Sequence, residues 1–183
     1  MSKFLNGNRK PSKRTPEDFP LSASALRILI PGNFYLLPLP TQTVYIPGLS
    51  SCMLMLHEKG IFVFLQQVRF GLIYGNFQEK YWHSLGLMGE DTPFASPYLT
   101  NQENIRLLAL TLRLPESQFH SVIVFGSECD LRKASKKTNL TLLHAEQIEE
   151  HFERTLPALP PLYSDSQLVA LRDIFLLHAA ENE

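Results

Sequence analysis

Two short apolar runs separated by a polar turn dominate the middle of the chain. The first run spans residues 52–56, and the second spans residues 61–68 and is rich in β-branched and aromatic residues. The turn between them ends in Gly60, where the chain can need a positive φ angle. Runs that are apolar at nearly every position are typical of strands buried on both faces. The pattern therefore predicts a hairpin at the middle of a sheet.

Other apolar patterns place helices and strands on either side of this hairpin. Helical spacing or capping signals predict helices at residues 22–30, 105–115, 145–154 and 164–178. Apolar runs predict further strands at residues 121–125 and 140–143, and prolines confine residues 33–47 to edge strands and irregular chain. Glycine, proline and charged residues predict loops at residues 86–97 and 130–138.

Composition narrows the class of protein. A chain of 183 residues with 44% hydrophobic and 19% charged residues is ordinary for a soluble globular protein of one domain. No apolar run reaches membrane-spanning length, and two cysteines do not make a disulfide framework. We therefore expect a cytoplasmic protein with no membrane partner, built as one domain over residues 21–183 behind a flexible basic arm at residues 1–20.

Basic residues gather in two places, although the net charge of the chain is only −1. One group lies in the N-terminal arm and the other lies just past a predicted strand end, where α/β folds often bind ligands. Both groups can contact phosphates, and both are also compatible with a solvated tail and a solvated loop. The candidate nucleic-acid-binding residues are Arg9, Lys10, Lys13, Arg14, Arg132, Lys133, Lys136 and Lys137.

The hairpin and the residues after it resemble a known family. The stretch Gly60-Ile61-Phe62-Val63 is followed by Gly71-x-Ile73-x-Gly75, and Trp82, Pro97 and Asn101 come after it. This pattern resembles the nuclease-related domain (NERD), a branch of the PD-(D/E)XK restriction-endonuclease-like fold. The resemblance extends over about residues 25–178. It implies an α/β fold in which a central mixed sheet is flanked by helices.

The resemblance also implies where catalytic residues would fall, and this chain departs from the family at each place. The acids that the family carries on the two hairpin strands fall on Cys52 and Leu65, its lysine falls on Gln67, and its glutamine falls on Thr100. Leucine offers no lone pair to Mg²⁺, cysteine is a soft ligand, and neutral glutamine cannot offset developing negative charge as lysine does. We expect a catalytically inactive binding module with no cofactor or metal, whose partner is DNA or another protein.

One enzymatic alternative stays open at this point. Carboxylates can change position in this fold, and the candidates to rebuild a metal site are Glu58, Glu79, Glu90 and Asp91. Such a protein would be a metal-dependent nuclease with relocated ligands. The six histidines show no zinc-binding spacing, so zinc is not expected.

Overall fold

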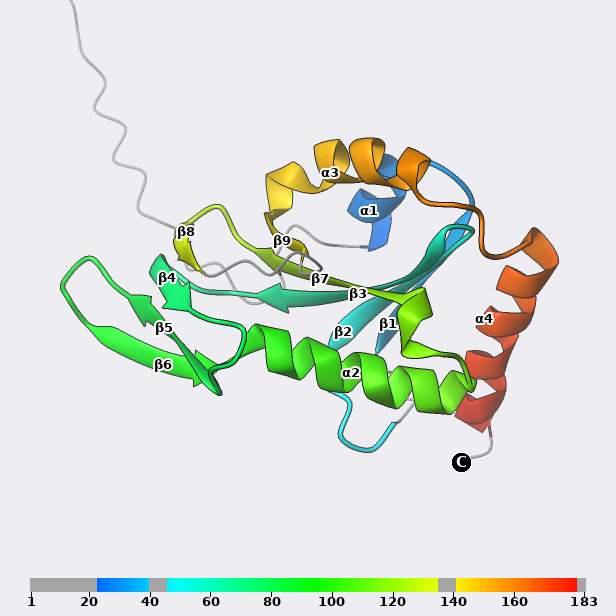
Figure 1. The fold of residues 1–183 in the computed structure, drawn as a ribbon, viewed down its shortest axis with the longest axis horizontal. Helices are drawn as coiled ribbons and strands as arrows, with labels where there is room; N and C mark the ends of the chain where they lie inside the picture. The colour runs from blue at the N-terminus through cyan, green and yellow to red at the C-terminus, as the bar shows by residue number, and fades with distance from the viewer. Residues whose placement is uncertain (1–22, 40–45, 135–140, 181–183) are drawn as a thin grey trace, which may run out of the picture.

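The computed structural model describes residues 23–39, 46–134 and 141–180. The described chain forms two β-sheets with helices packed against them (Figure 1). The larger sheet has five strands in the order β1-β2-β3-β7-β9, and the smaller has four in the order β6-β5-β4-β8. The α/β architecture with mixed sheet and flanking helices is confirmed. The N-terminal arm lies outside the described residues and stays a prediction.

The larger sheet is organised around the central hairpin. Its strands are β1 (Phe34–Leu39), β2 (Cys52–His57), β3 (Gly60–Gln67), β7 (Phe119–Phe125) and β9 (Thr141–His144). β1, β2 and β3 are antiparallel, whereas β7 pairs with β3 and β9 pairs with β7 in parallel. Every residue of β2 is buried, as its nearly continuous apolar run predicts. The predicted hairpin at the middle of a sheet is confirmed, and β1 is an edge strand as its prolines predict.

Helices cover both faces of this sheet (Figure 1). They are α1 (Ala23–Leu29), α2 (Pro97–Leu112), α3 (Ile148–Thr155) and α4 (Asp165–Ala180), with 3-10 turns at Glu116–Gln118, Ala145–Gln147 and Leu156–Ala158. Leu54 and Val63 pack with α2 and α4, whereas Met55 and Phe64 pack with α1 and α3. The two faces differ because successive side chains of a strand point to opposite sides.

Helix α2 begins earlier than the sequence pattern indicates. Its first residue is Pro97, and the hydroxyl of Ser96 accepts a hydrogen bond from the Leu99 amide at 3.4 Å. Proline fits the first helical position because the amide that it lacks has no partner within the helix. At α4 the predicted capping box is present, since the Ser164 amide donates to the Gln167 side chain at 2.8 Å.

The smaller sheet corrects two loop predictions. Its strands are β4 (Gly71–Gly75), β5 (Tyr81–Leu85), β6 (Asp91–Ala95) and β8 (Cys129–Ala134), so residues 91–95 and most of the predicted loop after residue 129 are strands. Pro93 is tolerated because β6 is the edge of the sheet. In β8, charged side chains alternate with buried Cys129 and Leu131. Because so many residues of this segment are charged, the sequence pattern indicated a loop and not a strand.

The glycines of the family motif serve the packing of this sheet. A Cβ atom on Gly75 would lie 2.4 Å from Cγ of Trp82, and one on Gly71 would lie 2.2 Å from the Leu85 carbonyl oxygen. Both glycines also have positive φ angles, 154° and 79°. Trp82 is fully buried, and its Nε1 donates to the Asn76 carbonyl oxygen at 2.9 Å. Trp82 therefore belongs to the hydrophobic core beneath the smaller sheet.

Candidate functional site

Cys52 and Leu65 lie side by side on neighbouring strands. Met53 of β2 is opposite Phe64 of β3, and continuing this antiparallel register by one residue places Cys52 opposite Leu65. Directly opposed residues have Cβ atoms about 4.5–5.5 Å apart. The structure thus brings together the two positions to which the family resemblance assigns carboxylates. Both side chains point to the face that α2 covers, like Leu54 and Val63 farther along the strands.

Both side chains belong to the hydrophobic core. Cys52 is 7% exposed and Leu65 is 4% exposed. Burial raises the pKa of the Cys52 thiol to about 12, so the sulfur stays protonated and is a poor nucleophile and a poor metal ligand. Gln67 follows on the same face of β3 and is half-buried, as is Thr100 on α2. Their assignment to catalytic positions of the family stays a prediction.

Two buried asparagines of α2 lie against the same face. Asn101 donates from Nδ2 to the Val63 carbonyl oxygen at 2.9 Å and to the Ser121 hydroxyl at 2.8 Å. Asn104 accepts from the Ser50 amide at 2.9 Å. Asn101 Oδ1 and Asn104 Nδ2 are buried without a hydrogen-bond partner among the described residues. Asn101 therefore ties α2 to both β3 and β7.

Replacing Asn101 by alanine is expected to destabilise the protein by about 1–3 kcal/mol, because Val63 and Ser121 lose a buried donor. Gln102→Ala is the matched control, since Gln102 is the exposed neighbour on the same helix. The control should change stability by less than about 0.5 kcal/mol. Urea denaturation of both variants measures the difference, and equal midpoints would refute the bridging role of Asn101.

The four candidate acids do not gather around Cys52 and Leu65. Glu58 lies in the turn at the far end of β2, about 20 Å along the strand from Cys52. Glu79 accepts from the amide and side chain of Asn76 at 3.0 and 2.8 Å. Glu90 and Asp91 lie at the exposed β5–β6 hairpin. Within the described residues, no three His, Cys, Asp or Glu side chains are placed to hold a metal ion.

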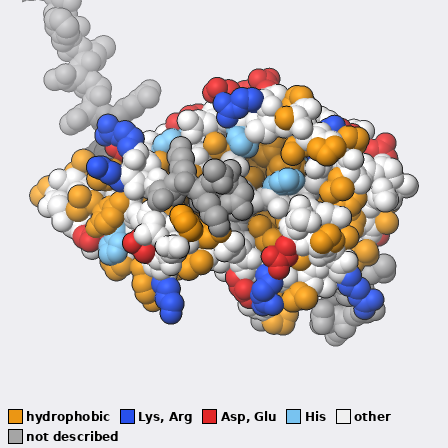
Figure 2. All heavy atoms as spheres, in the orientation of Figure 1, with side chains coloured by type: hydrophobic (Ala, Val, Ile, Leu, Met, Phe, Trp, Pro, Cys, Tyr) orange, Lys and Arg blue, Asp and Glu red, His pale blue; other side chains and the backbone are white. Residues whose placement is uncertain are grey.

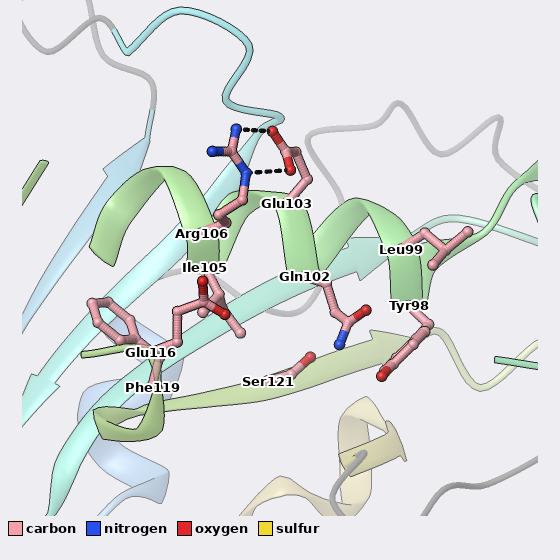
Figure 3. Close-up of a pocket in the computed structure, with 9 residues that line it drawn as sticks. All are labelled: Tyr98, Leu99, Gln102, Glu103, Ile105, Arg106, Glu116, Phe119 and Ser121. Atoms are coloured by element: carbon pink, nitrogen blue, oxygen red, sulfur yellow. Dashed lines mark hydrogen bonds and ion pairs between the residues drawn. The ribbon is translucent and has the colours of Figure 1, made fainter. Parts of the chain in front are cut away.

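A pocket of about 480 Å³ lies between α2 and the start of β7 (Figure 3). Gln102 and Tyr98 point from the helix towards Ser121 on the strand, and Glu116 stands at the other end. Arg106 bonds Glu103 in bidentate fashion and thereby lowers the pKa of that carboxyl. The four positions of the family's catalytic residues are not among the lining residues. This pocket is therefore distinct from the place where a family nuclease would bind metal.

One continuous stretch of the chain contains the paired strands β2 and β3, the two glycines packed on Leu85 and Trp82, and helix α2. Residues 53–126 match the nuclease-related domain, NERD. The resemblance seen in the sequence is thus confirmed over about two fifths of the chain. Neither the comparison with curated proteins nor the comparison with solved structures gave a match.

The NERD match begins one residue after Cys52 and ends at Gly126. It includes Leu65, Gln67 and Thr100, so the departures from the family's chemistry lie inside the matched stretch or at its border. Among the described residues, strands β8 and β9 and helices α3 and α4 follow the match along the chain. None of the helices in the described residues is long and apolar enough to cross a membrane.

Two of the predicted phosphate-binding residues lie beside the NERD match, on β8. Arg132 and Lys133 are exposed, and Lys133 is opposite Tyr74 of β4. Arg132 donates from Nε to Asp130 at 2.8 Å, and this contact lowers the pKa of Asp130 to about 2. The remaining six, Arg9, Lys10, Lys13, Arg14, Lys136 and Lys137, lie outside the described residues.

Sequence reasoning missed several polar residues of this region. Asn104 precedes the buried Leu108 by one helical turn and therefore lies on the buried face of α2. A polar residue at this helical spacing could have identified Asn104 from the sequence. Tyr74 on β4 and His83 on β5 were missed because each strand has only 5 residues, although Tyr81, His83 and Leu85 do alternate with buried Trp82.

Proposed function

We propose that this protein binds a macromolecular partner through a NERD-type fold and does not hydrolyse phosphodiesters. The supporting observation is that Cys52 and Leu65 are both buried, at positions that the register of β2 and β3, continued by one residue, places opposite each other. Hydrolysis of this kind needs a hard divalent cation held by carboxylates, which polarises the phosphate and generates hydroxide. A thiol held neutral by burial and a leucine cannot hold that cation.

Nucleic acid is the partner that we favour. Arg132 and Lys133 are exposed on β8, and the sequence supplies further basic residues in stretches 1–22 and 135–140, which lie outside the described residues. Contacts with phosphates are the main source of sequence-independent affinity for nucleic acids. A partner protein is the second candidate, favoured by the exposed apolar side chains of Phe70, Leu87 and Met88.

A thermal-shift titration with Mg²⁺ and with Mn²⁺ tests the absence of a catalytic metal site. We expect the melting temperature to stay at the value found with EDTA. A site on the folded protein would add about 2.7 kcal/mol of stability at a metal concentration of 100 times its Kd.

A rise that disappears in Glu79→Ala or Asp91→Ala would replace this proposal with the metal-dependent nuclease whose ligands are relocated. In wild type, Glu79 accepts from Asn76 in the turn between β4 and β5, and Asp91 accepts from Tyr74 at the start of β6.

A further inference from the structure

The smaller sheet has one buried face and one open face. Ile73, Trp82 and Phe94 point inward and are buried in the core cluster that also holds Leu65. The residues alternating with them, which include Tyr74 and His83, point outward and are partly exposed. Figure 2 shows hydrophobic and histidine side chains on this part of the surface, with Lys and Arg side chains gathered nearby over β8.

Tyr74 is held in a fixed position on the open face. Its ring stacks on His83 with centroids 5.1 Å apart and an angle of 12° between the planes. Its hydroxyl donates to Asp91 at 2.9 Å, and His83 Nδ1 contacts the same carboxylate at 3.0 Å. The hydrogen bond to Asp91 raises the pKa of Tyr74, so the ring stays uncharged at neutral pH. An aromatic ring ordered in this way loses little rotational freedom when a ligand stacks on it.

A groove of about 500 Å³ lies beside Tyr74, over β4, the turn that follows it and Lys133 of β8. Its lining residues are Leu72, Tyr74, Gly75, Asn76, Glu79 and Lys133. Because β4 lies between β5 and β8, His83 covers one side of the Tyr74 ring and the groove lies on the other. Lys133 is the cross-strand partner of Tyr74, and both residues line the groove.

Lys133 is the cationic side chain that lines the groove, and Glu79 is the anionic one. Asp91 is bonded by Tyr74 and His83, Asp130 by Arg132, and Glu79 by Asn76. Within the described part of the chain, no ion pair or hydrogen bond joins the Lys133 ammonium to another residue. The hydrogen bonds from neutral Asn76 hold the Glu79 carboxylate in place but leave its charge, so an anionic group of a ligand would be attracted at Lys133 and not by the groove as a whole.

We propose that this groove binds one nucleotide of a single-stranded nucleic acid, with the base stacked on Tyr74 and the phosphate at Lys133. The proposal rests on nucleic acid being the partner of the proposed function. Aromatic side chains next to basic residues are the usual means of binding single strands without strong sequence preference. The strand must be single because bases in a duplex stack on each other and expose no face.

The test is fluorescence anisotropy of a labelled oligothymidylate with the full chain. Tyr74→Ala should weaken binding roughly 5- to 100-fold, whereas Tyr74→Phe, which keeps the ring and loses only the bond to Asp91, should bind close to wild type. Phe70→Ala is the matched control because Phe70 is an exposed aromatic residue outside the groove. Lys133→Ala should lower the salt dependence by about one phosphate contact. Lys59→Ala, which removes the same charge at the distant β2–β3 turn, should not.

The outcomes separate this inference from the proposed function. Binding that survives both Tyr74→Ala and Lys133→Ala overturns the groove site and leaves nucleic acid as the partner through other residues. Equal affinity for duplex and single strand overturns stacking on Tyr74. Absence of binding to either refutes the groove site and leaves the partner protein as the candidate. Metal-dependent cleavage of the probe contradicts the proposed function while the effects of the variants still report on the groove.

Discussion

The triple variant Cys52→Asp, Leu65→Glu, Gln67→Lys is expected to be less stable than wild type by about 3–5 kcal/mol without metal. Cys52 and Leu65 are buried and cross-strand neighbours, so two carboxylates would lose hydration and repel each other. Mg²⁺ or Mn²⁺ should recover part of the loss, because binding to the folded state adds to the free energy of unfolding. Differential scanning calorimetry with metal and with EDTA measures both effects.

The control for this experiment is the double variant Leu65→Glu, Gln67→Lys, which lacks the second carboxylate at position 52. It should be destabilised as well, but its melting temperature should depend much less on metal. If the triple variant folds but its melting temperature does not change with Mg²⁺ or Mn²⁺, positions 52 and 65 do not correspond to the metal-binding site of the family.

Trp82→Ala is expected to cost about 3–5 kcal/mol, the usual loss for a large aromatic residue removed from a core. Trp82 is fully buried and packs on Gly75, so the smaller sheet would lose its attachment to the larger one. Gly75→Ala should cost roughly 1–3 kcal/mol in wild type, because the new Cβ would meet the indole ring. Chemical denaturation of the single and double variants completes a double-mutant cycle.

The double-mutant cycle should give losses for the two substitutions that are less than additive. The loss caused by Gly75→Ala should shrink in the Trp82→Ala background, since the atom that it meets is gone. Tyr81→Ala is the control on the same strand, because its side chain is 61% exposed and points to the open face. Additive losses for Gly75 and Trp82 would contradict the close packing of this glycine against the indole.

The central hairpin could be predicted from the sequence because strands buried on both faces leave a nearly continuous apolar run. β6 and β8 could not be predicted, since each is short and at least half of its residues are polar or proline. In β8 the bulge beside Tyr74 further disturbs the alternation, so Arg132 and Lys133 both appear on the exposed side.

The candidate site was predictable only in part. The closeness of positions 52 and 65 could be predicted from the hairpin alone. An antiparallel register that closes at the His57–Gly60 turn places these two positions opposite each other. The Tyr74–His83–Asp91 cluster depends on the pairing of three strands, and the pairing of β4 with β8 joins segments far apart in the sequence. No local pattern of residues specifies such a pairing.

The most direct measurement of the central claim is a cleavage assay with purified wild-type protein, labelled single- and double-stranded DNA and RNA, and Mg²⁺ or Mn²⁺. The pairing of Cys52 with Leu65 predicts no product above the EDTA control. Cleavage that EDTA abolishes, and that Glu79→Ala or Asp91→Ala also abolishes, would contradict the claim and assign the protein a metal-dependent nuclease activity.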